Sequence, residues 1–552
     1  MPSLVTRSFL CAALAAALAA CSDAPAAPKA APSMAPILDE QGRVPPLSCP
    51  GAAWCATATG ELRVGAAKVA ITPAVETWTD TDGNGVHNDD EPFDDLNGNG
   101  QWDGVWLAGF GNARAATSVH DDVWARALVL EQGDVSIGLL ALDLVGFFHD
   151  DVLAIRQAAR DAGLPFDHVV VATTHNHQGP DTMGIWGPAT GISGYDAAYV
   201  QRLRERAVQA LKEAHAAARP ATLRFARTEA PELVNDTRLP KVIDQALTAV
   251  LFRDAQDNEA IASAVFWGNH PEALGSNNSE LTSDFPHYLR DELEQAHPDA
   301  VALYFNGSLG GLSTTIGIVG CPDGTGEQTC PQGTFERAEY VGRGAASRAL
   351  SALAASDAVE VGSGAAALGF ERRSRLLTTT NGALALAFTL GLLPRNLFSV
   401  ETGAQLSAEE QAVVGLGEIV GGNVALQTEL NLLRLGPLAI AMVPGELYPE
   451  LWLTLPDGQS LIERPEGADF PDAPKEPALS SLLPAGTVSV IVNNANDALG
   501  YIIPKAQWDQ VKPYAYVTGN DPQYGEVNSL GPDTAAALAE TFSSLTLASG
   551  AR

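Results

Sequence analysis

The sequence predicts an α/β protein with a single large layered catalytic domain, in which helices flank a mixed β-sheet. Short apolar runs typical of buried strands alternate along the chain with longer stretches typical of helices, which indicates α/β layering. No change of composition between residues 60 and 548 marks a second domain, and no internal repeat is visible. The 552 residues are enough to bury a large core.

The expected elements follow one another along the chain. Residues 62–71 alternate like a strand, and two apolar runs around Gln132-Gly133-Asp134 predict a hairpin of buried strands. Helices and strands then alternate, with an Ala-rich helix late in the series. Strands are predicted at 62–71, 123–130, 135–144, 168–172, 222–228, 246–253, 260–267, 301–306, 426–433, 437–443 and 487–493, and helices at about 150–162, 196–218, 284–296, 335–355 and 532–545.

The N-terminus is typical of a secreted lipoprotein. Arg7 supplies a positive charge, residues 8–20 form an Ala/Leu run, and small residues precede Cys21. The run is too short for a membrane-spanning helix. We therefore expect residues 1–20 to be a lipoprotein signal peptide and Cys21 to become the lipidated first residue. A plain secreted protein is the alternative.

The segment after the signal peptide is expected to be a tether. Residues 21–60 would comprise the lipidated cysteine and a linker, because residues 22–47 are rich in alanine and proline and cannot form a core. The catalytic domain is then expected to span residues 61–548. Ser22 after the cysteine favours the outer membrane, so the predicted location is the bacterial cell envelope, at the outer membrane and either periplasmic or surface-facing.

Charge and cysteines narrow the function classes. The formal net charge of −33 argues against nucleic acid as a partner, because such binding needs a basic face. It also argues against electrostatic attraction to anionic lipid heads. Four cysteines remain in an oxidising compartment, so Cys49–Cys55 and Cys321–Cys330 are expected to be short-loop disulfides, with a zinc site made from all four as the alternative.

An acidic insertion at residues 80–104 resembles two calcium-binding loops. In residues 80–91 oxygen donors stand at loop positions 1, 3, 5, 9 and 12, with Gly85 at position 6, as a calcium loop requires. Residues 95–103 repeat the first part of this pattern. We expect structural Ca²⁺ sites here, and a solvated acidic loop is the alternative. The predicted calcium ligands are Asp80, Asp82, Asn84, Asn88 and Glu91 in the first loop and Asp95, Asn97, Asn99 and Asp103 in the second.

A second insertion, at residues 382–393, is almost unbroken apolar sequence. Twelve residues cannot span a bilayer. The segment is expected to be either a buried helix or an apolar lip that meets a lipid chain.

Four polar residues stand out by their local sequence: His175, His270, Glu446 and Tyr501. Three of the four follow an apolar β-type run, so these side chains would emerge at the end of a strand, where α/β enzymes place their chemistry. Two imidazoles, a carboxylate and space for water make a catalytic zinc site. His177 would lie on the same face as His175, because one residue separates them in an extended segment. One imidazole can then bind the metal while its neighbour donates a hydrogen bond to substrate or developing charge.

Together these segments resemble the neutral/alkaline ceramidase family. Residues 174–180 (Thr-His-Asn-His-Gln-Gly-Pro) are similar to the family's Thr-His-Thr-His-Ser-Gly-Pro segment, which implies that His175 binds zinc and that His177 acts in the active site. The second zinc histidine of the family, which precedes a proline in many members, corresponds to His270. The family's Val-Pro-Gly-Glu segment is intact here and implies Glu446 as the zinc carboxylate, and its Tyr-Ile segment implies Tyr501 as a zinc contact.

The resemblance also implies three further active-site residues. The family's Asn-x-x-Arg segment fits residues 235–238, which implies a substrate-polarising role for Arg238. The family's Tyr-Glu-Ala segment, which ends in Gly-Pro, resembles residues 524–532 and implies that Tyr524 is an active-site residue. The family's Gly-Asp-Val-Ser-Pro-Asn segment appears as residues 310–315 (Gly-Gly-Leu-Ser-Thr-Thr), so Ser313 takes the place of the serine while its acidic and proline neighbours differ. Ser313 would be the nucleophile or a hydrogen-bond partner of the carbonyl.

The likeness covers roughly residues 62–545, without the C-terminal immunoglobulin-like domain of many members, and the calcium loops are additions to it. It implies zinc-dependent hydrolysis of the N-acyl amide bond of ceramide or a related lipid, giving a fatty acid and a sphingoid amine. Zinc would polarise the carbonyl and lower the pKa of a bound water to ~7. His177, Arg238 and Tyr524 would stabilise the oxyanion.

Two alternatives stay open. One is a zinc amidase or esterase that acts on another acyl substrate. The other is a non-catalytic, calcium-dependent binding lipoprotein, which the Asp/Asn loops favour. The partners expected on the main interpretation are a lipid substrate and a membrane reached through lipidated Cys21; the pattern predicts no oligomeric state.

Overall fold

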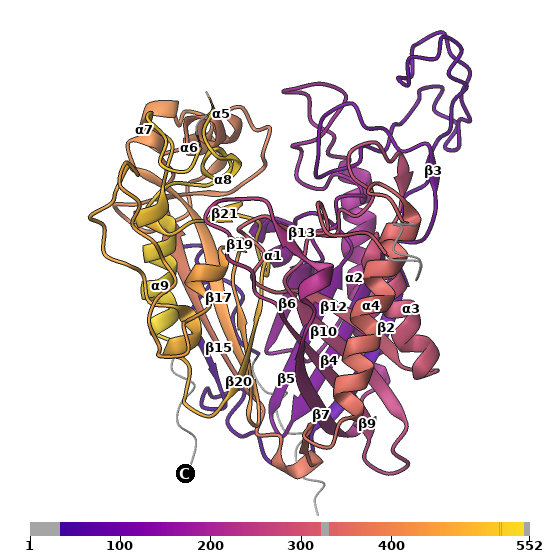
Figure 1. The fold of residues 1–552 in the computed structure, drawn as a ribbon, viewed down its shortest axis with the longest axis vertical. Helices are drawn as coiled ribbons and strands as arrows, with labels where there is room; N and C mark the ends of the chain where they lie inside the picture. The colour runs from indigo at the N-terminus through magenta and orange to yellow at the C-terminus, as the bar shows by residue number, and fades with distance from the viewer. Residues whose placement is uncertain (1–33, 322–329, 518, 520, 546–552) are drawn as a thin grey trace, which may run out of the picture. The chain divides into compact units, whose positions relative to one another are not determined.

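The computed structural model describes residues 34–321, 330–517, 519 and 521–545. The predicted signal peptide, Cys21 and the first part of the predicted tether lie outside the described residues. The compact unit that begins at Ala35 contains two large β-sheets packed face to face, with helices on their outer faces, as far as the described residues show (Figure 1). The mixed α/β class is thus confirmed, although two large sheets stand where one was expected.

The larger sheet has nine strands within the described ranges, in the order β12-β10-β9-β7-β2-β4-β5-β6, with β14 paired to β7. Most neighbours are antiparallel, whereas β10 pairs with β12 and β5 with β6 in parallel. The strands are β2 (Arg63–Ala70), β4 (Trp124–Gln132), β5 (Val135–Leu142), β6 (His168–Thr173), β7 (Arg219–Glu229), β9 (Ala246–Asp254), β10 (Ala260–Trp267), β12 (Val301–Asn306) and β14 (Val359–Val361).

Among the described residues, the smaller sheet has six strands, in the order β1-β15-β17-β18-β20, with β16 paired to β17. Its only parallel pair among these strands is β18 with β20. The strands are β1 (Leu47–Cys49), β15 (Gly369–Leu377), β16 (Leu397–Ser399), β17 (Val424–Leu435), β18 (Leu438–Met442) and β20 (Val488–Val492).

The hairpin of β4 and β5 shows why both faces of the larger sheet are buried. Leu128 and Leu130 of β4 join the core between the two sheets, whereas Ala127 and Val129 join the core under the helices. A strand that buries both faces is apolar at nearly every position, which is the pattern the sequence shows there.

Helices cover the outer faces of both sheets (Figure 1). α2 packs on β2 and β4, α4 packs on β7 and β9, and α9 packs on β15 and β17. No helix in the described ranges is long and apolar enough to cross a membrane. The longer helices are α1 (His149–Asp161), α2 (Ala197–Ala216), α3 (Phe285–Ala296), α4 (Phe335–Ala354), α5 (Gly382–Thr389) and α9 (Thr534–Ser543), and the shorter ones are α6 (Ala408–Gln411), α7 (Leu416–Val420) and α8 (Tyr524–Val527).

Each strand and helix predicted from the sequence is present within a few residues of its expected bounds. β15 was not predicted, because its sequence Gly-Phe-Glu-Arg-Arg-Ser-Arg-Leu-Leu lacks apolar alternation. Its charged side chains are held by distant parts of the chain. Arg372, for example, donates to the Pro45 carbonyl and contacts His168.

The expected boundary at residue 61 is wrong. The folded unit begins at Ala35, and Ala35, Leu47 and Cys55 are buried in the core between the sheets. β1 pairs with the edge of β15, a partner that becomes available only in the folded protein.

Three two-stranded ladders lie at one end of the sheets, around the ends of several large strands (Figure 1). They are β3 (Ser118–Val119) with β11 (Glu280–Leu281), β8 (Asn235–Asp236) with β13 (Ser313–Thr314), and β19 (Glu446–Leu447) with β21 (Tyr501–Ile502). The last two ladders carry predicted site residues.

Candidate metal centre

The parallel strand pairs explain why the predicted site residues meet. His175 follows β6, His270 follows β10, and Glu446 follows β18, so each side chain leaves the carboxyl end of a strand in a parallel pair. The two sheets face each other, and these three strand ends gather at one edge of the sandwich. His175 has a φ of 60°, a left-handed backbone angle that is uncommon for a non-glycine residue and typical of functional turns.

Two imidazoles and one carboxylate converge. The Nε2 atom of His270 lies 3.2 Å from Oε2 of Glu446, and Nε2 of His175 lies 3.4 Å from the same oxygen. The other ring nitrogen of each histidine is held by a backbone carbonyl: Nδ1 of His175 lies 2.6 Å from the Val145 oxygen, and Nδ1 of His270 lies 2.6 Å from the Ser313 oxygen. Both rings therefore direct Nε2 toward the shared point.

This geometry fits a zinc ion. One nitrogen each of His175, His177 and His270 lie within 4.8 Å of one another, and all three residues are buried. Imidazole and carboxylate donors suit zinc, and Nδ1 hydrogen bonds to carbonyl oxygens are the usual way that metal-binding histidines are oriented. Zinc itself is an inference from these donors.

The charges in the site follow from burial and from the neighbouring side chains. Burial raises the pKa of the Glu446 carboxyl, but His175 and His270 outweigh burial and hold that pKa well below its usual range. Burial, with His175 and His270 close by, lowers the pKa of His177 well below its usual range. Burial and the Glu446 carboxylate raise the pKa of Tyr501 well above its usual range.

Tyr501 and Tyr524 stand beside this centre. Tyr501 is directly opposite Glu446 in the β19–β21 ladder and is buried. Its ring centroid lies 5.8 Å from that of Tyr524, which begins α8 and is 55% exposed. Both line the cavity next to the centre, and the ladder places Tyr501 beside Glu446.

Ser313 is attached to the centre through its backbone. It lies on β13, and its carbonyl accepts hydrogen bonds from the backbone N–H of His270, at 2.9 Å, and from Nδ1 of that ring. Its Oγ is buried, with no hydrogen-bond partner among the described residues. The structure therefore connects the backbone of Ser313 to His270, and no base among the described residues pairs with its hydroxyl.

Arg238 lies away from the cavity. Its guanidinium donates to Glu526 at 2.9 Å and to the Leu239 carbonyl at 2.8 Å, and it lies 4.4 Å from the Tyr448 ring centroid. Both charged side chains are buried. These contacts bind Arg238 to α8, the helix that carries Tyr524. They therefore support a role in holding α8 in place, and not the contact with substrate that the resemblance implied.

A cavity of about 310 Å³ opens onto the centre. His175, His177, Glu446, Tyr501 and Tyr524 line one part of it. The rest is mainly apolar, with Phe110, Phe148, Trp186, Leu384, Phe388 and Leu393 among its lining residues. A polar end and an apolar wall are typical of sites for amphipathic ligands.

The apolar insertion builds part of that wall. Its α5 buries only Ala385, leaves Leu386 46% exposed and Leu390, just after the helix, 62% exposed, and turns Leu384 and Phe388 to the cavity. The expectation of a fully buried helix is therefore wrong. Part of this segment is open to solvent beside the cavity.

Glu272 was not identified from the sequence. It is buried, and its Oε2 lies 3.4 Å from Nδ1 of His177. Thr314 donates its hydroxyl to the other carboxylate oxygen. The only sequence signal is an acidic residue two positions after His270, which is too common a pattern to be informative.

The first acidic loop has the arrangement of a calcium loop. Carboxylate oxygens of Asp80, Asp82 and Glu91 lie within 4.8 Å of one another. Glu91 accepts hydrogen bonds from the backbone N–H groups of Thr81, at 2.6 Å, and Asn88, at 3.0 Å, which are loop positions 2 and 9.

The second loop repeats this pattern with a glutamate from outside the loop. Asp95 accepts from the N–H groups of loop positions 4 and 6 at 2.7 and 2.8 Å, the same distances as for Asp80 in the first loop. Glu76 accepts from Leu96, at 3.0 Å, and from Asp103, at 2.8 Å, which are positions 2 and 9 of the second loop. Glu76 thus stands where Glu91 stands in the first loop, although it precedes Asp95 in the chain, and this is why the sequence did not identify it.

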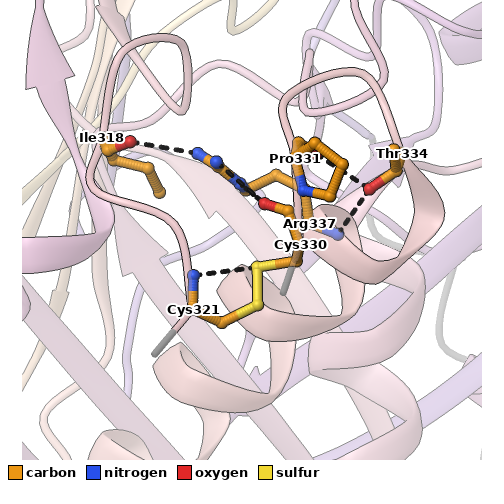
Figure 2. The surroundings of a disulfide bond; sticks show 6 residues. All are labelled: Ile318, Cys321, Cys330, Pro331, Thr334 and Arg337. Atoms are coloured by element: carbon orange, nitrogen blue, oxygen red, sulfur yellow. Dashed lines mark hydrogen bonds between the residues drawn. A yellow bond between two sulfur atoms is a disulfide. The ribbon is translucent and has the colours of Figure 1, made fainter. Parts of the chain in front are cut away.

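Both predicted disulfides are present, Cys49–Cys55 and Cys321–Cys330. The second one stands before α4, where Arg337 donates to the carbonyls of Ile318 and Cys330 (Figure 2). All four thiols are used in these bonds, so the alternative of a four-cysteine zinc site is wrong.

Fold and centre together define a layered α/β protein with a buried histidine and carboxylate cluster at an apolar cavity. The fold is that of neutral ceramidase. The chain is similar to the crystal structure of neutral ceramidase from Pseudomonas aeruginosa, with a TM-score of 0.60 and 16% sequence identity over 88% of this chain and 74% of that chain. It is also similar to a structure described as ceramidase complexed with C2, with a TM-score of 0.58 and 16% identity over 88% of this chain and 75% of that one. No protein-family model matches the sequence, and no curated protein matches it.

Proposed function

We propose that this protein is a zinc-dependent hydrolase that cleaves the N-acyl amide bond of ceramide or a related lipid. The observation that carries the proposal is the convergence of His175, His270 and Glu446 at the polar end of an apolar cavity. The shared fold with neutral ceramidase supports the same class of reaction.

The side chains divide the work between binding and chemistry. Zinc held at this centre would supply a Lewis acid for the carbonyl and would lower the pKa of water to about 7. His175, His270 and Glu446 would hold the ion, with Tyr501 beside them. His177 lines the cavity and would contact the reacting groups there, and Tyr524 stands at the exposed edge, where a substrate would enter.

The apolar wall selects the substrate class. Phe148, Leu384 and Phe388 offer surface that an acyl or sphingoid chain would cover, and burial of apolar surface stabilises a complex by ~25 cal/mol per Å². The amide bond of such a lipid would then reach the polar end, where the metal ligands lie.

Turnover with and without metal tests the function. Purified protein should release fatty acid from a fluorescent ceramide, lose this activity on chelation, and regain it with one equivalent of zinc. A panel of N-acyl amino acids and acyl esters separates ceramide from other acyl substrates. Stoichiometric zinc with no turnover of any N-acyl lipid would contradict the proposal.

We also propose that both acidic loops bind structural calcium. Asp80, Asp82 and Glu91 would supply charged ligands to the first site, and Glu76 would supply the glutamate of the second. In both loops the backbone N–H groups of positions 2 and 9 donate to the glutamate, which supports two calcium sites with the same arrangement of ligands.

Anchoring at the outer membrane through lipidated Cys21 remains part of the proposal. Its support is the apolar run 8–20 ahead of that cysteine. A Cys21→Ser variant should be recovered from the soluble fraction of the envelope, and recovery with the membranes would contradict anchoring.

A further inference from the structure

Glu272 is a buried carboxylate beside the metal centre to which the proposed function gives no role. It follows His270 by two residues, and its Oε2 lies 3.4 Å from Nδ1 of His177. Its other oxygen accepts the hydroxyl hydrogen of Thr314. The carboxylate therefore bridges His177 and β13, the ladder strand that also carries Ser313.

His177 has a fixed position but lacks hydrogen bonds at its ring. Its backbone N–H donates to the Pro271 carbonyl at 3.1 Å, and Phe110 packs against the ring at 5.1 Å between centroids. Gly109 lies so close that a Cβ there would come within 2.4 Å of the ring. Both ring nitrogens are buried and have no hydrogen-bond partner among the described residues. Buried ring nitrogens in proteins almost always have a partner, so one is expected when the site works.

We propose that Glu272 is the positioning residue of His177: it accepts a hydrogen bond from Nδ1–H and so fixes the tautomer and orientation of the imidazole. A carboxylate oxygen can only accept, so the nitrogen that faces it carries the hydrogen. The distance of 3.4 Å is slightly long for this bond, and such contacts commonly shorten when substrate is bound.

The proposal changes what His177 does in the proposed hydrolase, and in this respect it rests on that function. With the hydrogen on Nδ1, a neutral His177 offers a lone pair at Nε2 and accepts a hydrogen bond from the attacking group. The resemblance to ceramidases had instead implied that His177 donates a hydrogen bond to the oxyanion. The tautomer of His177 can be measured whether or not the protein hydrolyses ceramide.

Thr314 strengthens the assignment. Its hydroxyl binds the second oxygen of Glu272, and its backbone pairs with His270 in a β-bridge. The carboxylate is thus held from the same strand that orients His270, which leaves Oε2 for His177. Oriented carboxylate–histidine pairs of this kind are typical of hydrolytic sites.

Two measurements on the zinc-loaded protein test the role. In ¹⁵N-histidine spectra, His177 (assigned with His177→Asn) should be the Nδ1–H tautomer in the wild type and should lose this preference in Glu272→Gln. The same variant should lower kcat by about 10²-fold or more, as loss of an orienting carboxylate does, with KM within about threefold and zinc unchanged. Glu280→Gln, at an acidic residue of β11 that does not line the cavity, is the matched control and should change neither.

Each contrary result overturns the proposal. An Nε2–H tautomer in the wild type would do so without any variant, even if Glu272→Gln failed to fold. Loss of zinc in Glu272→Gln would make Glu272 a ligand, and a kcat within threefold of wild type would leave it a structural residue. If the wild type hydrolyses no N-acyl lipid, the hydrolase proposal fails, while the spectra still decide the tautomer.

Discussion

The centre depends on three side chains, His175, His270 and Glu446. The Glu446 carboxylate is shared by His175 and His270, and each imidazole is held at Nδ1 by a carbonyl. If these side chains bind zinc as proposed, substitution of any of the three removes a ligand and leaves its partners buried without a counterpart.

His175→Ala and Glu446→Ala should each reduce bound zinc to well below one equivalent and abolish turnover. Metal analysis after dialysis measures the first, and release of fatty acid measures the second. His215→Ala, a partly exposed histidine on α2, is the control and should keep full zinc. One equivalent of zinc in either site variant would remove that residue from the ligand set.

Ser313→Ala distinguishes two roles for this serine. Because no base in the described part of the chain pairs with its Oγ, we expect Ser313 to be a hydrogen-bond donor and not a nucleophile. Loss of one such donor typically lowers kcat by about 10²–10³-fold, which is the expected result. A residual rate indistinguishable from the uncatalysed reaction would instead identify Ser313 as the nucleophile.

At the scale of elements, α8 is positioned by contacts from a distant segment. Arg238 binds Glu526, and Gln523 both donates to the Leu239 carbonyl, at 2.8 Å, and accepts from its N–H, at 3.0 Å. This short helix carries Tyr524 at the cavity edge. Its place therefore depends on a buried ion pair and not on helix propensity.

Arg238→Met and Glu526→Leu should each lower the free energy of unfolding by about 3–5 kcal/mol, because each leaves a buried charge unpaired. The double variant should lose much less than the sum, which chemical denaturation can measure. The exposed pair Arg343–Glu339 is the control, and its removal should cost about 0.3–0.5 kcal/mol. Additive losses at Arg238 and Glu526 would show that the pair does not couple α8 to the rest of the protein.

The two acidic loops permit a matched test of calcium binding. Glu76→Gln and Glu91→Gln should each lower the calcium stoichiometry from two to about one, because each removes the carboxylate that completes one site. Isothermal titration with calcium measures this. If Glu76→Gln still binds two ions, the second loop does not use Glu76.

Buried carboxyl groups should make the stability of the whole molecule depend on pH. Burial raises the pKa of Glu450 to about 7 and that of Asp284 to about 7. In the unfolded chain these groups lose their protons at lower pH, so the folded state binds more protons. This contribution to stability is complete below the unfolded pKa values and is lost as the pH rises toward 7.

The contribution of Glu450 and Asp284 to the free energy of unfolding should therefore fall between pH 5 and pH 7, by at most about 1.4 kcal/mol per pH unit for each group. Urea denaturation at several pH values measures the slope, and Glu450→Gln should reduce it. Glu401→Gln, at an exposed position, is the control. A Glu450→Gln variant whose stability changes with pH between 5 and 7 as that of the wild type does would contradict the burial argument.

The order of helices and strands was predictable because it depends on local periodicity, as the hairpin of β4 and β5 illustrates. So were His175, His270 and Glu446, which stand at strand ends in recognisable segments. β15 and the start of the folded unit at Ala35 could not be predicted, because buried charges and short edge strands are stabilised only by partners far away in the chain.

The sequence alone therefore determined the elements and the residue types of the candidate metal centre and of the first acidic loop, all of which follow from spacing along the chain. Only the tertiary structure decided that two sheets pack face to face, that Arg238 binds Glu526, and that Glu76 and Glu272 approach a loop and a histidine to which no sequence pattern links them. The physical reason is that such contacts join residues brought together by packing, and spacing in the sequence carries no record of them.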